Sequence, residues 1–145
     1  MFLFLIFYVI SQKPKFSFHH CIIQACDVPL SREDNEKWDA LHASKLAYMK
    51  GSKTGRLLRY DPKTEEVDLL ATGMYFANGI SVDKDENYLI ITETFQAQVR
   101  KYYLKGEKMG QLDILLDRLP GLPDGVDCSH DKETCYIVLP NRKCY

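Results

Sequence analysis

The chain has 145 residues and a mass of 16.8 kDa, with 46% hydrophobic and 27% charged residues. This composition is typical of a folded domain and excludes disorder along the whole chain. The 19 Lys and Arg against 20 Asp and Glu give a net charge of −1, so no nucleic-acid partner is predicted. Nine Tyr and seven Phe favour strands, because aromatic side chains suit half-buried pleated surfaces.

The first ten residues, Met1–Ile10, are apolar and have no basic residue before them. Three interpretations stay open: a secretory signal or anchor that associates with a membrane, a strand, or a misassigned gene start. No apolar run reaches the ~20 residues that a membrane-spanning helix needs. We therefore divide the chain into a poorly defined N-terminal segment, residues 1–44, and a main domain, residues 45–145.

The N-terminal segment offers two further patterns. The run His19-His20-Cys21 with Cys26 suggests metal ligands, but its spacing suits no zinc site, so a strand or loop is favoured. Ser31 and Asp34 resemble a helix capping box, and Asn35–Lys50 has the apolar spacing of a short helix that passes into a strand.

The five cysteines include no CxxC pair, which argues against a zinc ribbon. Cys128 and Cys135 flank the polar segment Ser129–Thr134, and they would face each other if that segment is a hairpin turn. The interpretation favoured from the residues alone is two half-buried free thiols, because cysteine is often simply buried.

From Gly55 onward, short apolar runs alternate with turn signals such as Asp61-Pro62. This even spacing predicts an all-β sandwich, barrel or propeller. The predicted strands are 56–60, 67–70, 79–82, 88–92, 98–104, 114–116, 125–126 and 136–139. The run Tyr88–Thr92 is almost wholly apolar, as expected for a strand that is covered on both faces.

Internal similarity distinguishes among these folds. The segments Val67–Leu70, Asn78–Ile80 and Leu89–Ile91 recur about 45 residues later. The second copy consists of Leu112–Leu115, Asp124–Val126 and Ile137–Leu139. A period of about 40–50 residues with about four strands is typical of a propeller blade. The sequence therefore predicts an all-β fold that forms part of a propeller, with about two to three blades.

Several motifs resemble the strictosidine synthase-like family of six-bladed β-propellers. They are Gly55–Thr64, Phe76-Ala-Asn-Gly79, Thr92-Glu-Thr-Phe95, Leu119–Asp124 and the linking Arg100–Gly106. The resemblance covers roughly residues 46–139, and it suggests that the chain is a fragment of a longer propeller. The family includes the adipocyte plasma membrane-associated protein and is related to paraoxonases and gluconolactonase-like calcium hydrolases.

Asn78 and Asp124 stand at the start of equivalent predicted inner strands in successive blades, where both side chains can point at the propeller axis. Their oxygens suit Ca²⁺, whereas the simpler interpretation makes Asn78 a turn residue before Gly79. The resemblance implies calcium ligands at matching Asn-Gly and Asp-Asn motifs. Here the second motif is Asp124-Gly125, which lacks the expected carboxamide, and strictosidine synthase itself does not depend on such a metal.

Glu93, Thr94 and Phe95 follow a strand that is predicted to be buried, and we expect them to line a pocket. The residues alone favour a simpler interpretation for Glu93, a strand-end carboxylate in solvent. The catalytic Glu of strictosidine synthases belongs to a later blade and matches no position in this chain. The catalytic residue is therefore unknown.

The resemblance implies a parent enzyme, a hydrolase or lyase acting on a small organic substrate in an axial pocket, with this chain alone inactive. The alternative is a non-catalytic propeller segment whose open blade edges pair with other chains, since unpaired strands template addition. The expected location is the secretory pathway, with a membrane-anchored, vacuolar or extracellular protein.

Overall fold

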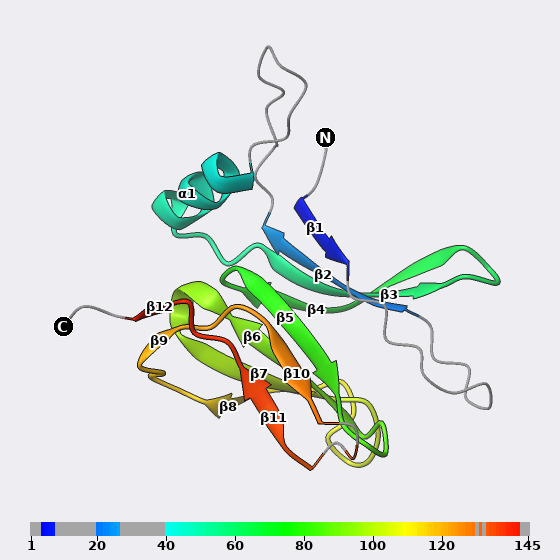
Figure 1. Ribbon diagram of the computed structural model, residues 1–145. Helices are drawn as coiled ribbons and strands as arrows, with labels where there is room; N and C mark the ends of the chain where they lie inside the picture. Colours follow the sequence, from blue (N-terminus) through cyan, green and yellow to red (C-terminus); the bar gives the residue numbers. More distant parts are fainter. Residues whose placement is uncertain (1–3, 8–19, 27–39, 130, 132, 143–145) are drawn as a thin grey trace.

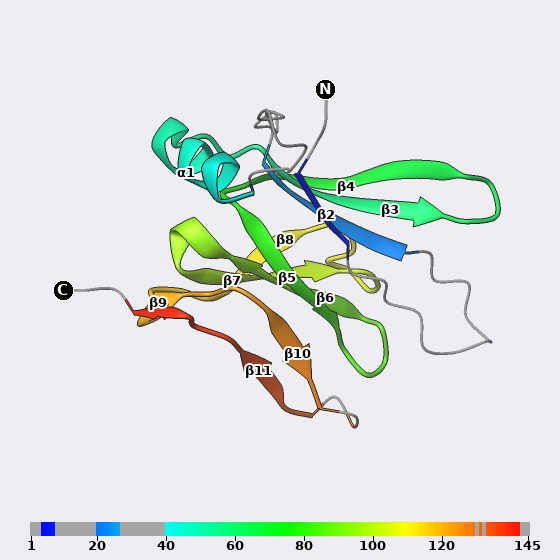
Figure 2. The same cartoon turned by 45° about the horizontal axis from the view of Figure 1, so that its top comes forward.

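The computed structural model describes residues 4–7, 20–26, 40–129, 131 and 133–142. The chain folds into three stacked antiparallel layers, visible from two directions in Figures 1 and 2. The predicted capping box at Ser31 and Asp34 lies outside the described residues, as does His19. Within Met1–Ile10 the described residues form a strand, and His20–Cys26 form another.

The first layer is a four-stranded sheet in the order β1-β2-β3-β4. Its strands are β1 (Phe4–Phe7), β2 (His20–Cys26), β3 (Gly55–Asp61) and β4 (Glu66–Met74). Helix α1 (Ala40–Lys50) lies between β2 and β3 in the chain. It confirms the short helix predicted within residues 35–50, but the predicted passage into a strand is wrong, because the helix continues to Lys50. Within the described parts of the chain, no helix has the length and apolar character needed to cross a membrane.

The second layer is a four-stranded sheet in the order β5-β6-β7-β8, and the third is a pair of short two-stranded ladders. The second-layer strands are β5 (Ala77–Val82), β6 (Tyr88–Glu93), β7 (Gln98–Tyr103) and β8 (Leu112–Leu116), with the 3₁₀ turn η1 (Thr94–Gln96) after β6. The third-layer strands are β9 (Gly121–Leu122), β10 (Val126–Cys128), β11 (Cys135–Ile137) and β12 (Asn141–Arg142).

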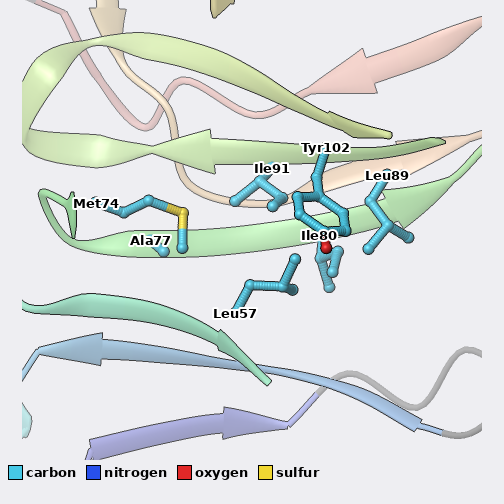
Figure 3. Packing of buried hydrophobic residues seen from close by; sticks show 7 residues of the cluster. All are labelled: Leu57, Met74, Ala77, Ile80, Leu89, Ile91 and Tyr102. Carbon is cyan, nitrogen blue, oxygen red and sulfur yellow. The ribbon is translucent and has the colours of Figure 1, made fainter. Parts of the chain in front are cut away.

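A hydrophobic core fills the space between the first two layers. Leu57 reaches across from β3 toward Ile80 of β5, and Figure 3 shows it pointing into the group formed by the second sheet. The buried members of this core are Leu57, Met74, Ala77, Ile80, Leu89, Ile91 and Tyr102. Removing this apolar area from water stabilises the stack of the two sheets.

A second core joins the second and third layers. Ile90 and Val99 of the second sheet pack against Val126 and Cys128 of β10. Side chains alternate between the two faces of a strand, so Ile90 faces the third layer while Leu89 and Ile91 face the first. Strand β6 is therefore covered on both faces, as its apolar run predicts.

The two repeat copies occupy equivalent strands. Val67–Leu70 lies in β4 and Leu112–Leu115 in β8, which are the last strands of their sheets. Asn78 lies in β5, the first strand of the second layer, and Asp124 lies just before β10. The all-β, propeller-like fold and its two to three blades are confirmed, and we call the three layers the first, second and third blades.

A disulfide joins Cys128 to Cys135, so the favoured interpretation of two free thiols is wrong. The two residues are direct partners in the β10–β11 register, which the sequence alone does not fix. The intervening turn is held by its own polar contacts. The Ser129 hydroxyl first, and the Glu133 N–H second, donate to Asp131 and hold the pKa of its carboxyl below the usual value.

Candidate functional site

The site is built around Asn78, the second residue of β5, at the end of the layers where the third blade joins the second. The chain enters β5 through Tyr75 and Phe76, and Phe76 has a left-handed φ of 62°. Such a conformation is rare for a bulky residue and persists only where the surroundings hold it. The Thr94 N–H donates to the Phe76 carbonyl at 3.0 Å, which fixes this turn and hence the start of β5.

Asp124 meets Asn78 across the boundary between the second and third blades. The Asn78 side-chain Nδ2 donates to the Asp124 carboxylate, and it also lies 3.3 Å from the Thr94 hydroxyl. The sequence separation of Asn78 and Asp124 is 46 residues, which is one blade period. The structure thus brings together the two residues that the repeat makes equivalent.

The backbone of Asp124 is fixed as firmly as its side chain. Its carbonyl accepts hydrogen bonds from the Gly79 N–H, at 3.0 Å, and from the Thr92 hydroxyl. Its N–H donates to the Val138 carbonyl at 2.9 Å. The exposed carboxylate of Asp124 therefore projects from a loop that neighbouring strands hold on both sides.

Two threonines, Thr92 of β6 and Thr94 of η1, complete this group. The hydroxyl of Thr92, which is fully buried, accepts from the Gly79 N–H at 2.6 Å. The Thr94 hydroxyl donates to the Pro123 carbonyl at 2.7 Å. We call Asn78, Thr92, Thr94 and Asp124 the Asn78–Asp124 cluster. The role of Thr92 is missed from sequence, because no local pattern shows that its hydroxyl meets the Asp124 carbonyl.

Glu93 lies on the opposite face of the strand and outside this cluster. It is fully buried, so the interpretation of a strand-end carboxylate in solvent is wrong. The Tyr75 N–H and the Gln98 side chain each donate to it at 2.6 Å, and an Arg100 Nη1 lies at 3.3 Å. The carboxylate thereby neutralises Arg100 and holds the turn that leads into Asn78.

Phe95 belongs to an aromatic group beside the cluster. Its ring centroid lies 4.5 Å from that of Phe76, 5.1 Å from Tyr48 and 5.2 Å from Tyr75. The Tyr75 hydroxyl donates to the Tyr48 carbonyl at 2.7 Å, which attaches α1 to the same turn. Of the three residues predicted to line a pocket, Thr94 contacts Asn78, Phe95 packs among aromatic rings and Glu93 is buried.

The cluster matches calcium in the kind of donor but supplies only part of a ligand set. Ca²⁺ takes about 6–8 oxygen ligands. Asn78 and Asp124 offer an amide oxygen and a carboxylate, and a half-turn of the Asn78 amide would aim its Oδ1 toward the space that the carboxylate faces. Among the described residues there is no group of three or more His, Cys, Asp or Glu suited to a metal ion.

Comparison with known proteins finds a matching family model and similar curated proteins. The family model described as strictosidine synthase matches residues 22–107, which run from β2 to just beyond β7. Protein STRICTOSIDINE SYNTHASE-LIKE 13 of Arabidopsis thaliana is 46% identical over 78 residues, which are 54% of this chain and 19% of that protein. The adipocyte plasma membrane-associated protein of Gallus gallus is 40% identical over 81 residues, 56% of this chain and 20% of that protein.

The chain therefore spans about a fifth of the length of these two relatives. Among solved structures, a luciferin-regenerating enzyme superposes with a TM-score of 0.51 and 17% identity. That match covers 60% of this chain and 30% of the enzyme's chain. At this identity the likeness shows a shared fold alone.

Proposed function

The chain belongs to the strictosidine synthase family, and we propose that it is part of a longer propeller enzyme, a hydrolase or lyase of a small organic substrate. The length of the relatives supports this, because the chain covers about a fifth of each. A propeller blade buries its faces against neighbouring blades, so further blades would complete the fold. The family sets the expectation of a binding site at the axis, and the structure supplies residues that suit one.

The observation that carries the proposal is the contact between Asn78 and Asp124. It joins β5 of the second blade to the loop just before β10 of the third, and the exposed carboxylate of Asp124 is available to a ligand. Asn78 lies on a strand, and Asp124 lies on a loop whose backbone is hydrogen-bonded on both sides, so both side chains are held in place for a ligand. Asn78 and Asp124 would bind the substrate or its metal, and Thr94 would support Asn78 from η1.

Calcium is the metal that we propose for this site. The donor oxygens of Asn78 and Asp124 are hard ligands, which favour Ca²⁺ over transition metals. The remaining ligands would come from other blades of the propeller and from water. Calcium bound there would supply a positive charge that polarises a carbonyl or phosphoryl oxygen of the substrate.

We further propose that the protein enters the secretory pathway. The Cys128–Cys135 disulfide supports this, because disulfides persist in oxidising compartments and are rare in the cytosol. The name of the relative from Gallus gallus, an adipocyte plasma membrane-associated protein, points the same way.

The test is to isolate the native protein from its source with an antibody against residues 55–139, and to assay it on small carboxylic esters and lactones. We expect a mass at least about twice that of this chain, as the family's propellers require, and hydrolysis that a calcium chelator abolishes. A native protein of 16.8 kDa without activity would contradict the proposed function. Activity that survives the chelator would contradict the calcium site alone.

A further inference from the structure

The β10–β11 hairpin is fastened at both ends, and the two fastenings differ in chemistry. At the turn end, the Cys128–Cys135 disulfide joins its strands. At the other end, the Val138 N–H donates to the Gly125 carbonyl at 3.0 Å, next to Asp124. We propose that this disulfide is a redox-sensitive clamp: its reduction loosens the hairpin and releases Asp124 from Asn78.

The hairpin depends on the disulfide because its ladder is short, although the Ser129 N–H also donates to the Thr134 carbonyl at 2.7 Å at the turn end. Strands β10 and β11 have three residues each, and an isolated two-stranded hairpin of this kind is marginal in water. The cross-link lowers the entropy of the open hairpin and so favours the closed one. On the outer face of the hairpin, Tyr136 is 66% exposed and Val138 is 57% exposed. The described part of the chain therefore adds little packing on that face.

The disulfide also belongs to the core that attaches the hairpin to the second blade. Cys128 is 7% exposed and packs with Ile90, Val99 and Val126, and Cys135 packs against the same group. After reduction, no covalent bond would hold Cys128 opposite Cys135 in the β10–β11 ladder. The cover over Ile90 and Val99 would then open together with the hairpin.

Loosening of the hairpin reaches the Asn78–Asp124 cluster through the backbone. The N–H of Asp124 donates to the Val138 carbonyl at the open end of the hairpin. The carbonyl of Asp124 receives the Gly79 N–H at 3.0 Å and the Thr92 hydroxyl. When Val138 moves, Asp124 loses its anchor on one side, and its contact with Asn78 weakens.

The chemistry is thiol–disulfide exchange with a dithiol reductant. A thiolate of the reductant attacks Sγ of Cys135, the more exposed of the two residues, and the S–S bond breaks with Cys128 leaving as a thiolate. The second thiol of the reductant then displaces Cys135 and forms the reductant's own disulfide. Two electrons and two protons pass to the protein, which ends with two thiols.

Amide hydrogen exchange of the full chain, with and without dithiothreitol, tests the clamp. We expect the Gly79, Asp124 and Val138 amides to exchange about tenfold faster after reduction, because local opening exposes them. The Tyr103 amide, which donates to the Gln111 carbonyl at the far edge of the second blade, should change less than about twofold.

Two cysteine variants separate this disulfide from the other thiols. The Cys128→Ser/Cys135→Ser variant should exchange fast at the three amides and ignore the reductant. The Cys21→Ser/Cys26→Ser/Cys144→Ser variant should respond as the parent chain does, and alkylation with mass mapping identifies the reduced cysteines in either case. Unchanged exchange at Gly79 and Asp124 after reduction of Cys128–Cys135 would overturn the proposal. Equal acceleration at Tyr103 would also overturn it, because the disulfide would then stabilise the whole fold.

Discussion

At the scale of single residues, Gly79 determines how closely the second and third blades approach. A Cβ at this position would lie 2.5 Å from the Val126 nitrogen and 2.8 Å from the Asp124 carbonyl oxygen. Both neighbours are backbone atoms, so no rotamer change can relieve the contact. The absence of a side chain at Gly79 is therefore what permits its N–H to reach the Asp124 carbonyl.

Gly79→Ala should lower the free energy of unfolding by about 3 kcal/mol, because the added methyl forces the two backbones apart. Gly106→Ala is the matched control. Gly106 has a positive φ of 82° and open space around its Cβ position, so its substitution should cost only about 1 kcal/mol of conformational strain. Urea unfolding measures both. A cost for Gly79→Ala no larger than that for Gly106→Ala would contradict the close approach.

Glu93 carries the second residue-scale prediction. Glu93→Gln should lower the free energy of unfolding by about 3 kcal/mol, because it leaves the partly buried Arg100 without its counter-charge. Adding Arg100→Met should recover part of that loss. Asp68→Asn, which removes an exposed ion pair with Arg59, is the control and should cost less than about 1 kcal/mol. Denaturant unfolding of the two single variants and the double variant is the measurement. If the double variant loses the sum of the two single losses in free energy of unfolding, Glu93 and Arg100 do not stabilise each other.

At the scale of elements, strand β6 joins two cores by presenting alternate side chains to each. Ile91→Ala should cost about 3 kcal/mol of stability, because it leaves a cavity between the first and second blades. Ile114→Ala on β8 is the control: its side chain is 57% exposed, so the cost should stay below about 0.5 kcal/mol. Thermal unfolding of both variants is the measurement, and similar losses would show that the first blade does not pack on Ile91.

The elements were largely predictable because their signals are local. Turn residues such as Asp61-Pro62 and the apolar run Tyr88–Thr92 mark strand ends and buried strands by composition alone. The disulfide and the burial of Glu93 were not, because both depend on register and on partners distant in sequence. Cys135 meets Cys128 only through the β10–β11 pairing, and Glu93 finds Arg100 only through the β6–β7 pairing.

The same distinction applies to the candidate site. The repeat period identified Asn78 and Asp124 as equivalent positions, and the structure brings their side chains into contact. Thr92 gives no such signal, because a buried threonine in a strand usually indicates packing. Its contact with the Asp124 carbonyl follows from the approach of the third blade, which no local pattern encodes.

At the scale of the whole molecule, the described layers leave an apolar face uncovered on the third blade. Tyr136 and Val138 are both more than half exposed there. We expect the isolated chain to self-associate through this face, and Tyr136→Thr with Val138→Thr should lower its apparent mass in sedimentation. Met109→Thr, in an exposed turn, should leave the association unchanged. A parent chain that stays monomeric at high concentration would contradict this expectation.

The most direct test of the central claim, a ligand site shared by two blades, is the thermal stability in calcium of the longer propeller protein proposed above, which holds the remaining ligands. Calcium at about ten times its dissociation constant should raise the melting temperature by about 3–6 °C, because it binds the folded state alone. Asp124→Asn, which keeps the contact with Asn78 but removes the charge, should abolish this shift. Asp127→Asn, on the same hairpin, should retain it. No shift in that longer protein, or an equal shift in its Asp124→Asn variant, would contradict the account.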